Sequence, residues 1–426
     1  MNLESQEIMM VNNISLEKTC RRDFFGSVNK VISISLLMLI CLILFVGCGG
    51  RSESNPQDAN LEEEAPADPN AYADFEKDQG TVSESDMSQY KQDAMSTIVA
   101  EYDYESSYGV PQEEKDGKVR SYLTGRLVDS SIGKRRPIAV MLNNIKEAQP
   151  MSGSSYADII YECVVEGSLT RLMGIFENWD DLGKIGSVRS CRNYFVYYAL
   201  ELDSIYCHYG QSAYAMPLLE QPYVDNLSGL AGDVGNIVYY RTTDRVAPHN
   251  AYASAKGIKK GIEIKGYDMD YSPDYQGKFT FARDGEIIVP STPDATDCRH
   301  VEPGYLINKP WFEYNESDGK YYRYEYDEPQ IDAENDEQLS VDNIILQYSS
   351  WEVVDEKGYL GFNCHSGGLC TYISHGKSIS GVWIRFGGDE GSVRYFDAEG
   401  KEIVVNQGKT WICIIQDTMA DKVVLS

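Results

Sequence analysis

Arginine residues gather in one polar loop of the chain, at a spacing suited to binding an anion. Arg189 and Arg192 lie three residues apart in the loop over residues 186–192, which leads into a helix predicted over residues 191–202. Side chains three apart share one face of a helix. The first-turn amides of a helix lack internal partners and attract negative charge. Guanidinium groups placed there are therefore suited to phosphate or carboxylate.

Further polar side chains follow the strands predicted nearby. Asn143 and Asn144 come directly after the apolar run Ile138–Leu142, and His208 ends the predicted strand Ile205–His208. Arg241 follows the next predicted strand, over residues 237–240. In open α/β sheets, ligands bind in the crevice beyond the carboxyl ends of the strands. We therefore expect these polar groups to lie at one edge of a sheet.

These loops together make up the set of residues predicted to bind an anionic ligand. Arg189, Arg192 and Arg241 are expected to hold the anion, because guanidinium groups match the geometry of phosphate and carboxylate. Arg171 could instead bridge to Glu166 across a predicted hairpin turn, and arginines three apart commonly form ion pairs with nearby carboxylates. The full set is Asn143, Asn144, Arg171, Arg189, Arg192, Arg241, Arg245, His249 and Asn250.

A catalytic interpretation of the same region rests on Ser212. This residue lies between a predicted strand and a predicted helix over residues 213–220, where a nucleophile elbow would lie, and His249 could act as its base. The glycine expected two places after the serine is missing, and no aspartate is singled out to orient the histidine. Capping of the following helix explains Ser212 more simply, so no catalytic residue is assigned.

Cysteine and histidine residues do not form a recognisable metal site. Cys364, His365, Cys370 and His375 share a glycine-rich stretch, but their spacing matches no common zinc pattern. Seven cysteines follow residue 48, an odd number that argues against a disulfide framework. Cysteines within apolar runs are expected to be core thiols. No metal and no cofactor are predicted.

Charge is distributed unevenly over the 426 residues. The formal net charge is −28, from 38 basic and 66 acidic residues, which excludes broad electrostatic capture of nucleic acid. Residues 51–118 hold 18 acids against five bases, whereas residues 119–260 hold 14 acids against 15 bases. The near-neutral middle block is therefore where an anionic ligand could bind.

The first 48 residues are predicted to be a lipoprotein signal peptide. A basic stretch precedes an apolar run over residues 31–46, and Cys48 follows a small residue, as in a bacterial lipobox. Cys48 is expected to be lipidated, the alternative being an uncleaved anchoring helix. Either way the remaining chain lies outside the cytoplasm, at the membrane surface. Residues 49–118 are predicted to form an acidic disordered stalk.

Two folded blocks are predicted beyond the stalk, giving an α+β fold. Residues 119–266 alternate short apolar strands with helices, which predicts an α/β domain around a mixed sheet that binds the ligand. Residues 267–426 are rich in alternating strand patterns and tyrosine, which predicts a mostly antiparallel, β-rich second domain.

Several strings in order resemble the YerB-like bacterial lipoproteins, over roughly residues 120–426. The strings are RPIAVMLNN (136–144), ADIIYE (157–162), VEGSLTR (165–171), KIGSVRSCR (184–192), APHN (247–250), GVW (381–383) and GKTWI (408–412). The resemblance implies a two-domain extracytoplasmic lipoprotein whose activity is not established.

The residues and the resemblance together predict a lipid-anchored protein on the outer face of the cell membrane. Its expected ligand is an anionic component of the cell envelope, such as a glycan or a peptidoglycan fragment. A hydrolase or transferase acting on an envelope polymer is one alternative. A scaffold for another envelope protein, using the acidic second domain, is the other.

Overall fold

The computed structural model describes residue 98 and residues 112–426. The predicted signal peptide, Cys48 and most of the predicted stalk lie outside the described residues. Among the residues described, no helix is long and apolar enough to cross a membrane.

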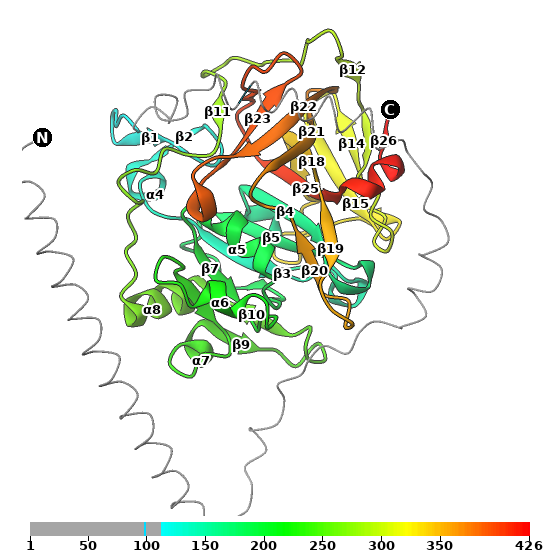
Figure 1. Cartoon of the computed structure of the whole chain (residues 1–426). Coiled ribbons are helices and arrows are strands. Elements are labelled where there is room, and N and C mark those ends of the chain that lie inside the picture. The colour runs from blue at the N-terminus through cyan, green and yellow to red at the C-terminus, as the bar shows by residue number, and fades with distance from the viewer. Residues whose placement is uncertain (1–97, 99–111) are drawn as a thin grey trace, which may run out of the picture. The chain divides into compact units, whose positions relative to one another are not determined.

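An 11-stranded mixed sheet runs through the described chain (Figure 1). Its order is β12-β22-β21-β18-β25-β4-β5-β3-β7-β8, and β23 pairs with β22. The strands are β3 (Ile138–Leu142), β4 (Ile159–Val164), β5 (Thr170–Phe176), β7 (Ile205–His208), β8 (Asn226–Ser228), β12 (Thr296–Asp297), β18 (Asn343–Ser349), β21 (Gly367–Ser374), β22 (Lys377–Arg385), β23 (Val393–Asp397) and β25 (Thr410–Gln416).

The two predicted blocks share this sheet. β25 lies between β18 and β4 and is parallel to both, so the sheet continues across the boundary predicted at residue 266. The second block is therefore not antiparallel throughout, although β18, β21, β22 and β23 pair antiparallel as expected. The fold is a mixed sheet with more strand than helix.

The remaining elements surround this sheet. Three small sheets have two strands each: β1 (Lys118–Arg120) with β2 (Leu127–Asp129), β11 (Thr280–Phe281) with β24 (Val404–Val405), and β19 (Trp351–Val353) with β20 (Leu360–Phe362). A three-stranded sheet has the order β6 (Ile185–Gly186), β10 (Ala251–Ala253), β9 (Tyr239–Arg241). A six-stranded sheet has the order β16 (Glu328–Pro329), β15 (Lys320–Glu325), β14 (Trp311–Asn315), β13 (His300–Glu302), β26 (Val424–Leu425), and β17 (Ser340–Val341) pairs with β15. The α-helices are α4 (Ser130–Gly133), α5 (Asn193–Leu200), α6 (Met216–Leu219), α7 (Gly235–Val238) and α8 (Ala255–Lys265).

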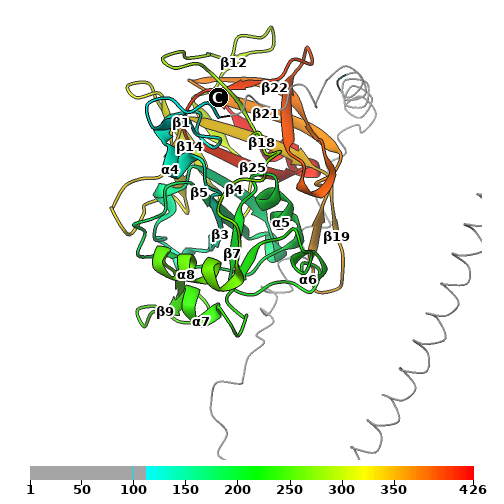
Figure 2. The same ribbon diagram turned by 90° about the vertical axis from the view of Figure 1, so that its left-hand side faces the viewer.

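Both faces of the main sheet are buried, which explains the continuous apolar run of β3. Side chains of one face pack against α5 through Tyr194 and Tyr198. Those of the other face pack against α8 and against Phe312 of the β14 sheet. Figure 1 shows α6, α7, α8, β9 and β10 near β3 and β7, and Figure 2 shows α7, α8 and β9 side by side there. A strand covered on both faces needs no alternation of polar residues.

One local prediction for the first block is wrong, and another is right except for its bounds. The strand predicted over residues 237–240 begins only at Tyr239, because residues 235–238 form α7, whose Val238 packs against Gly261 of α8. Tertiary packing thus overrides the strand preference of Ile237 and Val238. The helix predicted over residues 191–202 is shorter, and its N-cap is Arg192.

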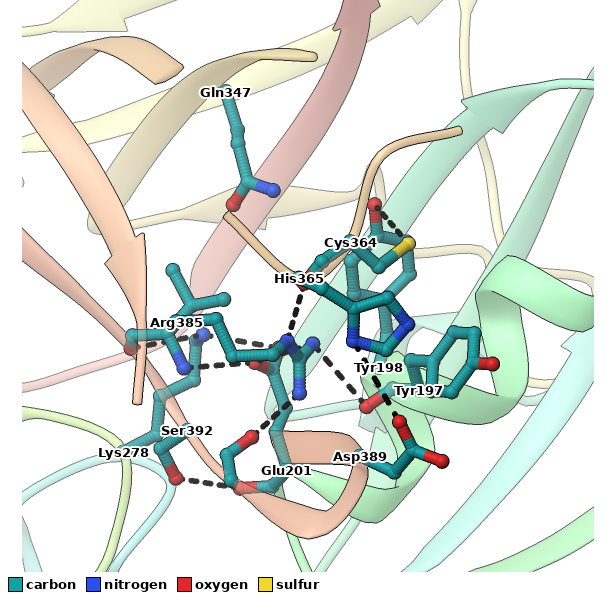
Figure 3. Close-up of polar contacts among 12 residues, drawn as sticks. Tyr197, Tyr198, Glu201, Lys278, Gln347, Cys364, His365, Arg385, Asp389 and Ser392 are labelled. Carbon is teal, nitrogen blue, oxygen red and sulfur yellow. Dashed lines mark hydrogen bonds and ion pairs between the residues drawn. The ribbon is translucent and has the colours of Figure 1, made fainter. Parts of the chain in front are cut away.

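A buried ion-pair network joins α5 to the second block (Figure 3). The Glu201 carboxylate, at the end of α5, accepts from Lys278 Nζ at 3.0 Å, from Arg385 Nη2 at 3.3 Å and from the Val393 amide at 3.1 Å. Tyr161 of β4 also donates its hydroxyl to Glu201. The Lys278 and Glu201 side chains are fully buried, and burial lowers the pKa of Lys278 to about 8. A buried charge in this network is stable only while its ion-pair and hydrogen-bond partners are present.

We expect Lys278→Met to destabilise the fold by about 3–5 kcal/mol, because it leaves the buried Glu201 carboxylate short of a partner. Urea unfolding measures the effect. The control is Lys260→Met, which breaks a pair with Glu263 whose side chains are 58% and 65% exposed. That change is expected to cost about 1 kcal/mol or less. Equal losses in the two variants would contradict the structural role of the network.

Candidate anion-binding site

The loop over residues 186–192 lies between the main sheet and the small β6-β10-β9 sheet. The Arg189 amide donates to the Met141 carbonyl of β3 at 3.0 Å, and the Val188 amide donates to the Ala251 carbonyl of β10 at 2.7 Å. Gly186 adopts φ 145°, and a Cβ there would lie 2.8 Å from the Val188 nitrogen. The backbone therefore fixes the path of this loop, and glycine is required at its start.

Asn143 links the loop over residues 186–192 to His249, which lies in the loop after β9. β3 and β7 are parallel, and Asn143 follows β3 while His208 is the last residue of β7, so both residues lie at the same edge of the sheet. The Asn143 backbone amide donates to the Ser187 carbonyl at 2.9 Å. Its side-chain Nδ2 donates to His249 Nδ1 at 3.0 Å. Burial, together with the Arg189 and Arg245 charges, lowers the pKa of His249.

Arg189 is a buried cation among other cations. Only 8% of the residue is exposed, and its burial together with the guanidinium groups of Arg192 and Arg241 lowers its pKa to about 10. Like charges at short range disfavour the charged form of each group. An anion bound here would relieve that repulsion.

Arg192 forms an ion pair inside the protein. Its Nε donates to Glu166 Oε1 at 2.8 Å, its Nη2 donates to Glu166 Oε2 at 2.5 Å, and its Nη1 donates to the Cys191 carbonyl at 3.0 Å. Arg171 is close to this pair and donates to the Ser190 carbonyl at 2.7 Å. Burial, followed by the charge of Arg192, lowers the pKa of Arg171 to about 10. Glu166 thus bonds to Arg192 and fixes its position.

β9 and the loop that follows it supply the other predicted cations. Arg241 lies in the small sheet, not in the main one, and its Nη1 donates to Asn250 Oδ1 at 2.8 Å. Its guanidinium lies 4.7 Å from the centre of the Tyr209 ring. Arg245 donates to the carbonyls of Ala148 and Pro150. No carboxylate of residues 112–426 lies within 4 Å of either guanidinium, so their charges are not offset by direct pairing.

The side chains of Asn144 and His208 bond to residues other than the arginines of the predicted set. His208 is buried, with Nδ1 2.8 Å from the Gly210 carbonyl, and burial lowers its pKa. The Asn144 side chain points into a separate buried network, where Nδ2 donates to Glu162 Oε1 at 3.2 Å and to Thr170 Oγ1 at 2.7 Å. Of the predicted set, Asn144 is therefore positioned by the core and not by the arginines.

That buried network was not predicted from the sequence. Glu162 of β4 accepts from Arg323 Nη2 of β15 at 2.7 Å and from Trp411 Nε1 of β25 at 3.2 Å. Asn308 Nδ2 donates to Glu162 at 3.0 Å and to Glu325 at 3.2 Å. Burial raises the pKa of Glu325 to about 7. The signal in the sequence was a carboxylate within the apolar run Ile159–Val164.

The residues of the catalytic and metal interpretations are not assembled into a site. Ser212 is buried, and its hydroxyl has no hydrogen-bond partner among the described residues, whereas His249 contacts Asn143. The N-cap of α6 is Ala215, so Ser212 does not cap that helix. Cys364 Sγ lies 3.6 Å from the Tyr198 hydroxyl, and His365 lies beside Asp389 (Figure 3). Within the described chain, the seven cysteines are buried and free.

Comparisons with family models, with known sequences and with solved structures all lead to the same family. The N-terminal domain model described as "Protein of unknown function (DUF3048)" matches residues 123–268, and its C-terminal domain model matches residues 301–412. The YerB lipoprotein of Bacillus subtilis (strain 168) is 31% identical over 315 residues, which cover 72% of this chain and 89% of that protein. The crystal structure of YerB from Bacillus subtilis matches with a TM-score of 0.63 and 29% identity, over 72% of this chain and 99% of that one.

Glu325→Gln should remove a pH dependence of stability. A carboxyl whose pKa rises from 4.5 to about 7 on folding makes the folded state bind more protons. The Glu325 carboxyl therefore favours the folded state at low pH. As the pH rises to about 7 this contribution is lost, and the free energy of unfolding falls by about 3 kcal/mol. Urea unfolding from pH 4.5 to 8 would test this. The variant should show a flatter curve than the wild type, and Glu356→Gln, at an exposed carboxylate, should not.

Proposed function

The chain belongs to the YerB-like family of DUF3048 lipoproteins, and on that premise we propose that it is a lipid-anchored extracytoplasmic protein that binds an anionic component of the cell envelope. The proposed ligand is a phosphorylated or carboxylated glycan or a peptidoglycan fragment. Lipidation at Cys48 would hold the chain at the outer face of the membrane, where such ligands occur.

The observation that carries this proposal is the crowding of guanidinium groups around Arg189. Arg189 and Arg192 of the loop over residues 186–192 and Arg241 of β9 are close enough for their charges to act on Arg189, whose charged form is also disfavoured by burial. Perturbed ionisable groups of this kind concentrate at functional sites.

The neutral donors around the arginines complete a recognition surface. Asn250 bonds to Arg241, and Asn143 bonds to His249 beside Arg189. These contacts hold the cations in place before a ligand arrives, so little conformational freedom is lost on binding. A binding role needs no nucleophile.

Arg189→Gln should weaken anion binding. Loss of one charged hydrogen-bond donor should lower the affinity for inorganic phosphate at least tenfold, measured by isothermal titration calorimetry. Urea unfolding of the variant checks that it is folded under the conditions of the titration. The control is Arg299→Gln, at an exposed arginine that pairs with Glu316 at 2.9 Å. Unchanged phosphate affinity in Arg189→Gln would overturn the proposed function.

His249 should favour phosphate binding more strongly as the pH falls. Burial and the charges of Arg189 and Arg245 lower the pKa of His249 in the free protein, which favours the neutral imidazole. A bound anion beside Arg189 favours the charged imidazole and raises that pKa, so binding takes up a proton. Phosphate itself also gains a proton as the pH falls, so the effect of His249 is read from the difference between the pH profiles of the wild type and the variant. His249→Gln should lose most of this effect, and an identical pH profile in the variant would argue against a role for His249.

A further inference from the structure

The main sheet carries an apolar patch on β21, β22 and β23, separate from the two clusters that cover the rest of its faces. Leu369 of β21, Val382 of β22 and Phe396 of β23 are paired side by side across these strands. Ile384 lies two residues after Val382 and therefore points to the same face. We name these four residues the outer patch. Val382, Ile384 and Phe396 are at most 3% exposed, so other atoms must lie over them.

Ile98 packs on the outer patch. This residue is helical, only 5% of it is exposed, and it belongs to the same apolar cluster as Val382, Ile384 and Phe396. It also lies close to the turn after β23, because a Cβ on Gly400 would be 3.3 Å from Ile98 Cγ1. Ile98 precedes β1 in the chain and falls within the predicted stalk. A residue of the stalk is therefore buried against the folded region.

The sequence around Ile98 has the period of an amphipathic helix. Apolar side chains recur there at spacings of three and four residues, which places them on one helix face: Met95, Ile98, Val99 and Tyr102. Ser96 falls on the opposite face. A short helix is marginal in water by itself and gains its stability from packing of its apolar face. The pattern therefore indicates a helix that forms on an apolar surface.

We propose that the outer patch is a docking surface for residues 87–102 of the same chain, which bind it as an amphipathic helix. The contact of Ile98 with the patch identifies this occupant. One isoleucine is too small to cover Val382, Ile384 and Phe396, since a buried core residue touches several neighbours. Met95, Val99 and Tyr102 would supply the remaining contacts. The docking does not depend on whether the candidate site binds an anion.

Docking of this helix changes how the folded region is tethered. The stalk predicted over residues 49–118 would be free only up to about residue 87, and the chain would leave the folded region at the outer patch. The reach of a flexible tether grows with the square root of its length, so a shorter free segment keeps the folded region closer to its anchor. The outer patch would thus act as the attachment point of the tether.

Hydrogen–deuterium exchange of the predicted mature chain, residues 49–426, tests the docking. We expect the amides of residues 93–102 to be protected in the wild type. Ile98→Ala should lower this protection by about tenfold or more, because it removes the apolar contact although it raises the helix propensity. The control is Ser96→Ala, which also raises the helix propensity but changes the opposite face, so protection should persist. The amides of β3 should stay protected in both variants.

The same measurement at low and high protein concentration identifies the occupant, together with sedimentation velocity. A monomer with equal protection at both concentrations would show that the segment docks on its own chain. Protection that appears only with a dimer would overturn the proposed occupant, because a second copy would then cover the patch. Equal protection in Ile98→Ala and the wild type would overturn the docking. Fast exchange over residues 93–102 of the wild type would overturn it whatever the variants show.

Discussion

The buried carboxylate of Glu162 is the contact on which the arrangement of the two blocks depends. Arg323, Trp411 and Asn144 donate to it from β15, from β25 and from the end of β3. A buried carboxylate is tolerated only when its donors are present together. The same contact therefore docks the β14–β15 sheet, fixes the inserted strand β25 and holds the peptide from which Asn143 reaches the candidate site.

The candidate site has the opposite electrostatic character. Glu162 is surrounded by donors that stabilise its charge, whereas burial and the nearby guanidinium groups of Arg192 and Arg241 disfavour the charged form of Arg189. Both arrangements are buried and lie near the end of β3. The first joins segments that are far apart in the chain, and the second is the place where the proposed function puts an anion.

The sequence predicted those parts of the fold that depend on local pattern. The apolar run of β3 matches the observed strand, and the hairpin of β4 and β5 turns at Gly167 as expected. The sequence could not show that β25 pairs with β4 in the main sheet, because that pairing joins residues far apart in the chain. The pairing of Arg192 with Glu166, 26 residues away, was hidden for the same reason. A local pattern carries no information on which distant partner a charge will meet.

The position of β25 has a consequence for how the chain reaches its folded state. Every other strand of the main sheet precedes β25 in the sequence, yet β25 occupies the middle of that sheet. Until it emerges, β4 and β18 have no partner between them, and the sheet remains two separate pieces. Long-range parallel pairing of this kind forms slowly. The main sheet can therefore become continuous only once residues 410–416 are free to enter it, whatever structure the earlier strands have already formed.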